Sequence, residues 1–168
     1  MDTQDAILTK LDVRDFARRR VEDGMKVKIL EAARATGSSR NTQHWRFILV
    51  QEPKNLNTLA DDSATGPWVR SADFAVIITI DPTVPGSVID AGRVLQDMEL
   101  AAWNLGIASG LYTGFKDADM RHDFGIPPEL KPVAVLGFGY PVRRIRGRKE
   151  RKPLEELVSL EVFGRKFK

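Results

Sequence analysis

The sequence contains no cysteine among its 168 residues. Disulfide bonds, thiolate catalysis and metal sites built on thiolates are therefore excluded. The two histidines, His44 and His122, lie far apart in the chain, so a zinc or iron site is not expected. No apolar run approaches the ~20 residues that a membrane-spanning helix needs, and no membrane association is expected. The N-terminal residues are acidic and polar, unlike a signal peptide, which leads us to expect a cytoplasmic protein.

The composition is that of an ordinary globular protein, with 42% hydrophobic and 29% charged residues. We expect one domain over residues 1–168, large enough to bury a core. The net charge is +3, and cations are concentrated between Arg143 and Lys152. This basic segment is open to three interpretations: a solvated loop, a nucleic-acid patch, or phosphate binding by a few of its residues.

Hydrophobic periodicity predicts helices and strands in mixed order. The longest periodic segment is 87–106, whose second half is apolar almost all round, as in a central or interface helix. Segment 74–80 is nearly all apolar, which is typical of a strand covered on both faces. Helices are expected at 3–11, 24–35, 54–60, 87–106, 118–124 and 153–158, and strands at 46–51, 74–80, 109–112 and 133–139. Because βαβ alternation is missing, the order favours an α+β fold.

Residues 37–47 form a polar turn between a helix and a strand, and they offer several neutral hydrogen-bond donors and acceptors. Such a set suits a planar ligand rich in polar atoms better than it suits a metal. The segment resembles the Pro-Ser-x-x-Asn-x-Gln-Pro-Trp-x-Phe stretch of the nitroreductase family of flavin enzymes. Gly37 and His44 stand where that family usually has proline. The resemblance extends over residues 7–163.

A second segment, Lys10-Leu11-Asp12-Val13-Arg14, resembles the family's opening motif, commonly Arg-Arg-Ser-x-Arg. The resemblance implies that Lys10 binds the flavin phosphate and Arg14 the polar edge of the ring, with Leu11 and Asp12 beside the cofactor. Asp12 departs from the usual serine, and a carboxylate is repelled by phosphate. Asp12 could instead face the ring edge or a backbone amide, or it could indicate the flavin-fragmenting branch of the superfamily.

The resemblance implies further cofactor contacts. Leu111, Tyr112, Thr113 and Gly114 would pass the flavin ring, with the backbone N–H groups of Thr113 and Gly114 directed at flavin N5 and O4 as the catalytic groups. Such donors would stabilise the negative charge of the reduced ring. No counterpart is found in loop 61–67 for the residues that hold the pyrimidine end in longer family members.

Two more parts of the cofactor site follow from the resemblance. Lys149 and Arg151 match a Lys-x-Arg-x-Pro segment and would complete the phosphate site with Lys10. Ser38, Ser39 and Asn41 would reach the ribityl chain of the flavin bound to the partner subunit. The remaining arginines of the basic segment are left as surface residues or as a patch for an anionic partner: Arg143, Arg144, Arg146 and Arg148.

The expected fold is therefore a nitroreductase-like sandwich, with a central antiparallel sheet flanked by helices, in an intertwined homodimer whose tail, about 159–168, crosses to the partner. The implied function is an FMN-dependent oxidoreductase that passes a hydride from NADH or NADPH through flavin N5 to a nitroaromatic or quinone by a ping-pong mechanism. Alternatives are a flavin-fragmenting or reductive-dehalogenating enzyme, or a non-catalytic flavin- or nucleic-acid-binding protein. Neither a metal nor nucleic acid is the expected partner.

Overall fold

A computed structural model of the chain describes residues 2–143, 145 and 149–167. Four strands form one sheet in the order β1-β2-β4-β3, and every neighbouring pair is antiparallel. The strands are β1 (Trp45–Val50), β2 (Phe74–Ile80), β3 (Ala108–Tyr112) and β4 (Lys131–Gly139). The predicted α+β class with a central antiparallel sheet is confirmed.

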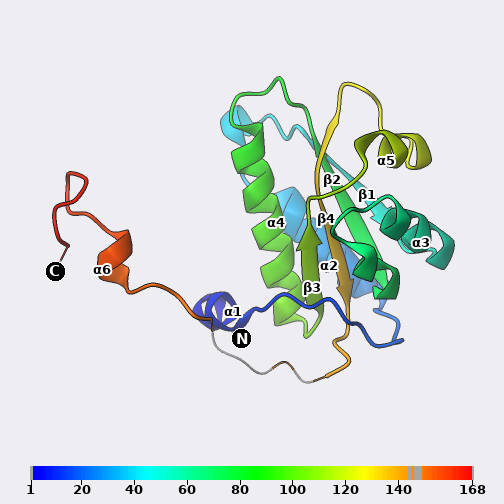
Figure 1. Ribbon diagram of the computed structural model, residues 1–168, viewed down its shortest axis with the longest axis horizontal. Coiled ribbons are helices and arrows are strands. Elements are labelled where there is room, and N and C mark those ends of the chain that lie inside the picture. Colours follow the sequence, from blue (N-terminus) through cyan, green and yellow to red (C-terminus); the bar gives the residue numbers. More distant parts are fainter. Residues whose placement is uncertain (1, 144, 146–148, 168) are drawn as a thin grey trace.

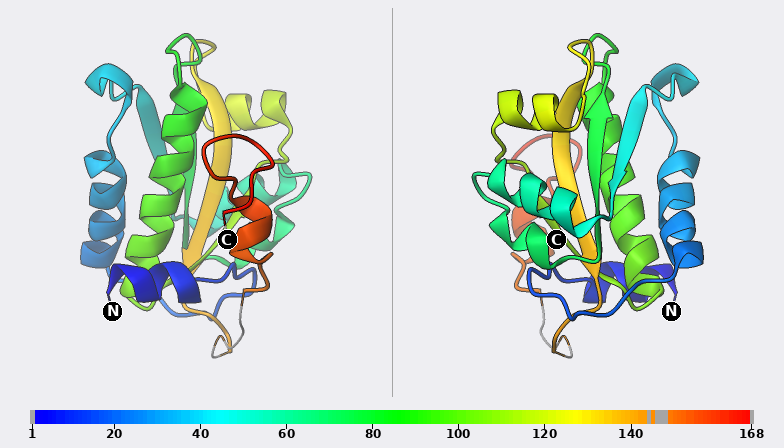
Figure 2. Two further views of the ribbon diagram at one scale, coloured as in Figure 1. Left: turned by 90° about the vertical axis from the view of Figure 1, so that its left-hand side faces the viewer. Right: turned by 90° about the vertical axis from the view of Figure 1, so that its right-hand side faces the viewer.

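Helices cover both faces of the sheet (Figures 1 and 2). One face carries the two long helices, α2 (Asp23–Ala35) and α4 (Ser87–Asn104). The other face carries α3 (Pro53–Asp61), the 3-10 helix η2 (Pro67–Ser71) and α5 (Asp117–Asp123). The remaining short elements are α1 (Thr3–Thr9), the 3-10 turn η1 (Ser39–Asn41) and α6 (Leu154–Leu157). None of these helices, over the part of the chain that the structure describes, is long and apolar enough to span a membrane.

Strand β2 joins the two halves of the core. Because side chains alternate along a strand, Phe74 and Ile78 pack toward α2 and α4, whereas Ala75 and Ile77 pack toward α3 and α5. All seven β2 residues are buried, which confirms the prediction of a strand covered on both faces. The Phe74 ring also stacks on Phe138 of β4, with centroids 4.8 Å apart.

Element ends differ from the sequence prediction where the chain turns. The first helix, expected over 3–11, ends at Thr9 because Lys10 takes an extended conformation with ψ of 125°. The helix expected over 87–106 ends at Asn104, and Gly106, with φ of +75°, allows the chain to turn into β3. The 3-10 helix η2 is not predicted by the sequence, because glycine and proline at its start indicate only a loop.

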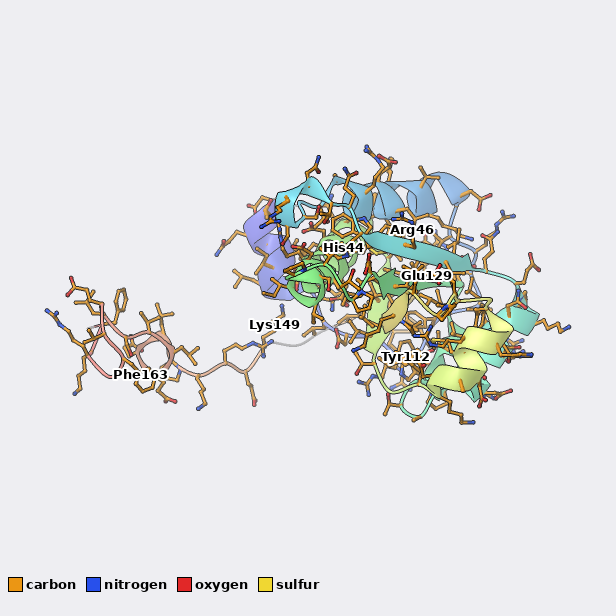
Figure 3. The ribbon with its side chains drawn as sticks, turned by 90° about the horizontal axis from the view of Figure 1, so that it is seen from above. His44, Arg46, Tyr112, Glu129, Lys149 and Phe163 are labelled. Carbon is orange, nitrogen blue, oxygen red and sulfur yellow. The ribbon has the colours of Figure 1, made fainter. Side chains whose placement is uncertain are left out.

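The C-terminal tail leaves the body of the molecule after Lys149 (Figures 1 and 3). The helix predicted at 153–158 is present as α6. Several apolar side chains of the tail are exposed, including Phe163 fully, Leu157 at 63% and Val162 at 63%. Large apolar side chains gathered in one segment are normally buried against other protein surface. In the described structure these side chains of the tail are not buried against the body of the molecule.

Candidate functional site

Segment Lys10–Arg14 runs directly beside the start of β3. Asp12 forms a parallel bridge with Ser109, and the Val13 N–H donates to the Ser109 carbonyl oxygen over 2.8 Å. The two backbones approach so closely at Gly110 that an added Cβ would lie 2.3 Å from the Val13 carbonyl oxygen. Glycine is therefore required at this position, and it fixes the segment against the sheet.

Replacing Gly110 by alanine is expected to destabilise the fold by about 1–3 kcal/mol, because the new methyl overlaps backbone that cannot yield without moving segment 10–14. Gly92 provides the matched control: it lies exposed on α4 with nothing within 4 Å of its added Cβ. Gly92→Ala should stabilise by roughly 0.5–1 kcal/mol through helix propensity. Urea unfolding of both variants tests this pair, and an unchanged stability of Gly110→Ala would contradict the close approach.

Lys10 is the centre of a buried charge cluster. Its Nζ donates to Glu99 Oε1 of α4 at 2.6 Å and to Asp12 Oδ1 at 2.5 Å. The Lys10 and Glu99 side chains are each 9% exposed, whereas that of Asp12 is 55% exposed. Glu99 Oε1 also accepts from the Ser109 hydroxyl at 3.2 Å. A buried ammonium requires such a counterion, so Glu99 fixes where the Lys10 charge lies.

Lys10 and Asp12 line a hollow of about 580 Å³ with residues from the tail. Lys149 and Arg151 form its other charged wall, and Figure 3 shows Lys149 where the tail meets the body. Lys149 Nζ donates to the Ile7 carbonyl oxygen at 2.5 Å, which ties the start of the tail to α1. The full lining is Lys10, Leu11, Asp12, Gln96, Lys149, Glu150 and Arg151. The structure thus brings together the residues expected at the phosphate, though they come from opposite ends of the sequence.

Arg14 lies next to this hollow but lines a separate one of about 510 Å³, together with Asp15, Arg143 and Ile145. Asp12 lines both, so the two hollows adjoin at this residue. Of the arginines left without a role, only Arg143 can be placed, in this second hollow. Arg144, Arg146 and Arg148 lie outside the described residues.

The Ser38–Asn41 turn lies at the far end of α4 from Lys10. Its anchor is Asp90, a buried residue whose Oδ2 accepts from the Ser39 N–H at 2.8 Å and lies 3.3 Å from His44 Nε2. The Ser39 hydrogen bond is the main cause that lowers the pKa of Asp90 below its usual value. Asp90 and Glu99 are nine residues apart, so the two anchored segments are separated by about 13 Å along the helix.

The expected catalytic loop after β3 is packed against loop 61–67. Thr113 is exposed, and the Gly114 N–H donates to Thr65 Oγ1 at 3.2 Å while the Gly114 carbonyl oxygen accepts from the Ala64 N–H at 2.8 Å. Tyr112 points away into the core, where its hydroxyl donates to the Leu59 carbonyl oxygen and burial raises its pKa. Leu111 packs on the α2–α4 side. The loop lies about 13 Å along β3 from the Asp12 bridge, since Thr113 is four positions after Ser109.

Sequence reasoning missed three residues that organise these segments. Glu99 and Asp90 are the two charged residues on the mainly apolar buried face of α4, and this interruption of the apolar pattern is the signal that could have marked them. Thr65 gave no signal, because its partner Gly114 is 49 positions away. Within the described residues, no group of three or more acidic or histidine side chains is placed to hold a metal ion.

Comparisons with known proteins agree with one another on the family of this chain. The family model described as "Nitroreductase family" matches residues 7–81 and 83–140. A protein of Methanothermobacter thermautotrophicus, provisionally named an NADH dehydrogenase/NAD(P)H nitroreductase, is 31% identical over 150 residues, which cover 84% of this chain and 78% of the relative.

Solved structures agree with this match. A nitroreductase family protein from Clostridium difficile 630 superposes with a TM-score of 0.88 at 28% identity, covering 97% of this chain and 100% of that one. A protein described as an FMN-dependent nitroreductase, from Clostridium difficile R20291, superposes with a TM-score of 0.85 at 21% identity, covering 92% and 96%. The second likeness shows the shared fold.

Proposed function

Since this chain belongs to the nitroreductase family, we propose that it is an FMN-dependent oxidoreductase that transfers a hydride from NADH or NADPH to an electron-poor acceptor such as a quinone or a nitroaromatic compound. The observation that carries the proposal is the gathering of Lys10, Lys149 and Arg151 around one hollow. A fold neighbour is described as FMN-dependent, which supports the choice of cofactor. Bound FMN would supply the hydride-transferring centre, for which the protein has no group of its own.

The charges of the hollow fit a phosphate group. Within the described chain, Lys149 and Arg151 donate only to backbone carbonyl oxygens, so no carboxylate neutralises either cation. A guanidinium can bind phosphate oxygens in bidentate fashion, and an ammonium acts as a point charge. Lys149 and Arg151 would hold the phosphate from the tail side and Lys10 from the body, with Leu11 and Asp12 beside it. Two lining residues do not fit, Asp12 and Glu150, because their negative charges oppose that of the phosphate.

The remaining contacts would orient the ring. Arg14, whose side chain has no partner among the described residues, would donate to the polar edge of the ring system. Leu111 and Tyr112 place the following loop, in which the backbone N–H groups of Thr113 and Gly114 would face the reacting edge. To do so, the Gly114 N–H would have to break its hydrogen bond to Thr65 Oγ1 and donate to the cofactor instead. Fixed N–H dipoles at this place would stabilise negative charge without reorganisation.

We further propose that the active unit is a homodimer. The Ser38–Asn41 turn does not line the hollow at Lys10 and is anchored at the other end of α4, so Ser38, Ser39 and Asn41 would complete the site of the partner subunit. The single domain, residues 1–168, would extend its tail, about 159–168, onto that partner. The exposed Phe163 and Leu157, together with exposed Val88 and Ile89 of α4, supply apolar surface for such an interface.

Steady-state kinetics with NADH or NADPH and benzoquinone test the function. If donor and acceptor use one site in turn, double-reciprocal plots at several fixed quinone concentrations should be parallel lines. Lines that intersect would contradict the ping-pong order, because both substrates would then be bound together. Absence of turnover with either donor, in protein supplied with excess FMN, would contradict the proposed function itself.

A further inference from the structure

Lys10 already holds two anions. The first, Glu99, is buried, accepts from Lys10 and from Ser109, and belongs to the rigid helix α4. The second, Asp12, has a side chain that is 55% exposed and that contacts no cation but Lys10 among the described residues. Glu99 is therefore the permanent counterion of Lys10, whereas Asp12 occupies the side of the ammonium that faces the hollow.

Asp12 lies where an incoming anion would have to bind. It lines the hollow together with the cations Lys10, Lys149 and Arg151. Glu150 lines the hollow as well, but Asp12 is the carboxylate that accepts from Lys10. The Asp12 backbone is held beside the hollow, because Asp12 is bridged to Ser109 and the Val13 N–H donates to the Ser109 carbonyl oxygen. Only the side chain can turn away, and an ammonium released by Asp12 would then offer its N–H to another acceptor.

We propose that Asp12 is a specificity-determining residue that acts as an internal competitor for the phosphate of the flavin. The inference rests on the proposed function. An anionic phosphate that approaches Lys10 from the hollow meets the Asp12 carboxylate and must either displace it or bind beside it, and both weaken binding, whereas a flavin without phosphate leaves the Lys10–Asp12 pair intact. Asp12 therefore lowers the preference of this chain for FMN over riboflavin.

The test is titration of the full-length protein with FMN and with riboflavin, followed by flavin fluorescence at fixed pH and ionic strength. In Asp12→Asn, FMN should bind on the order of tenfold more tightly, equivalent to about 1.4 kcal/mol, while the Kd of riboflavin changes less than about twofold. Asp12→Ser should shift FMN binding in the same direction. Lys10 keeps Glu99 in both variants, so folding should be preserved, and circular dichroism checks this.

Asp15→Asn is the matched control. Asp15 lies three residues along the same segment and is exposed, but it lines the neighbouring hollow and not the one at Lys10. The substitution removes the same unit of charge, so it should change the Kd of FMN by less than about twofold. An equal gain in Asp15→Asn would show a general charge effect and overturn the assignment to Asp12.

The other outcomes separate the inference from the proposed function. If the native protein binds FMN and Asp12→Asn binds it equally or more weakly, the competitor role is wrong while the flavin function stands. If the gain appears equally with riboflavin, the effect does not act through phosphate, and the inference fails. If neither the native protein nor any variant binds either flavin, the proposed function fails together with the inference.

Discussion

Simultaneous replacement of Lys149 and Arg151 by alanine is expected to weaken FMN binding about a hundredfold, which corresponds to about 2.7 kcal/mol. Hydrogen bonds to charged groups contribute about 1.5–3 kcal/mol each, and we take the lower end because the hollow is open to solvent. Riboflavin should bind this variant nearly as well as it binds the native protein, since it presents no phosphate. Calorimetric titration with both flavins measures the two values.

The control for this experiment uses two cations of the same tail. Arg165→Ala/Lys166→Ala removes equal charge from the chain, but these residues lie beyond α6 and do not line the hollow. FMN affinity should then change less than about threefold. If replacing Lys149 and Arg151 weakens the binding of riboflavin as strongly as that of FMN, they act through folding or dimer contacts, and the phosphate assignment is wrong.

A second large effect is expected from two charges placed on the tail. Leu157→Asp combined with Phe163→Asp should convert a dimer into a monomer, because both side chains are exposed and would otherwise be buried against the partner subunit. Light scattering after gel filtration should give a mass near 18.8 kDa for the variant and about twice that for the native chain. Bound flavin should be lost with the partner, since Ser38, Ser39 and Asn41 would no longer reach it.

Leu49→Asp serves as the comparison for the tail variant. Leu49 is an apolar side chain with 39% exposure, but it lies on the outer strand β1 and away from the tail. The native oligomeric state and flavin content should both persist in this variant. A native protein that is already monomeric at micromolar concentration would refute the proposed homodimer, whatever the variants show.

The sequence is sufficient to predict the elements with strong periodicity. Strand 74–80 is predicted with its observed ends, because an unbroken apolar run bounded by polar residues fits a strand covered on both faces. The helix predicted over 87–106 is too long by two residues, since its end depends on the left-handed conformation of Gly106. Short motifs likewise single out segment 10–14 and the pair Lys149 and Arg151, which the fold then brings to one hollow.

The partners of these residues could not be predicted, because they come from distant parts of the chain. Lys10 and Glu99 are 89 positions apart, and nothing local to either one indicates the other. The same holds for Ser39 with Asp90 and for Gly114 with Thr65. Such pairs depend on how α4 and loop 61–67 pack against the sheet, which is a property of the whole fold. The sequence therefore predicts the segments of the site but not the contacts that hold them.

The most direct test of the proposed function is the visible absorbance of the purified protein during anaerobic addition of NADH and then NADPH. The proposal predicts an oxidised flavin spectrum that bleaches with at least one donor and returns when benzoquinone is added. A protein that remains colourless after incubation with FMN, or whose flavin spectrum neither donor changes, would contradict it.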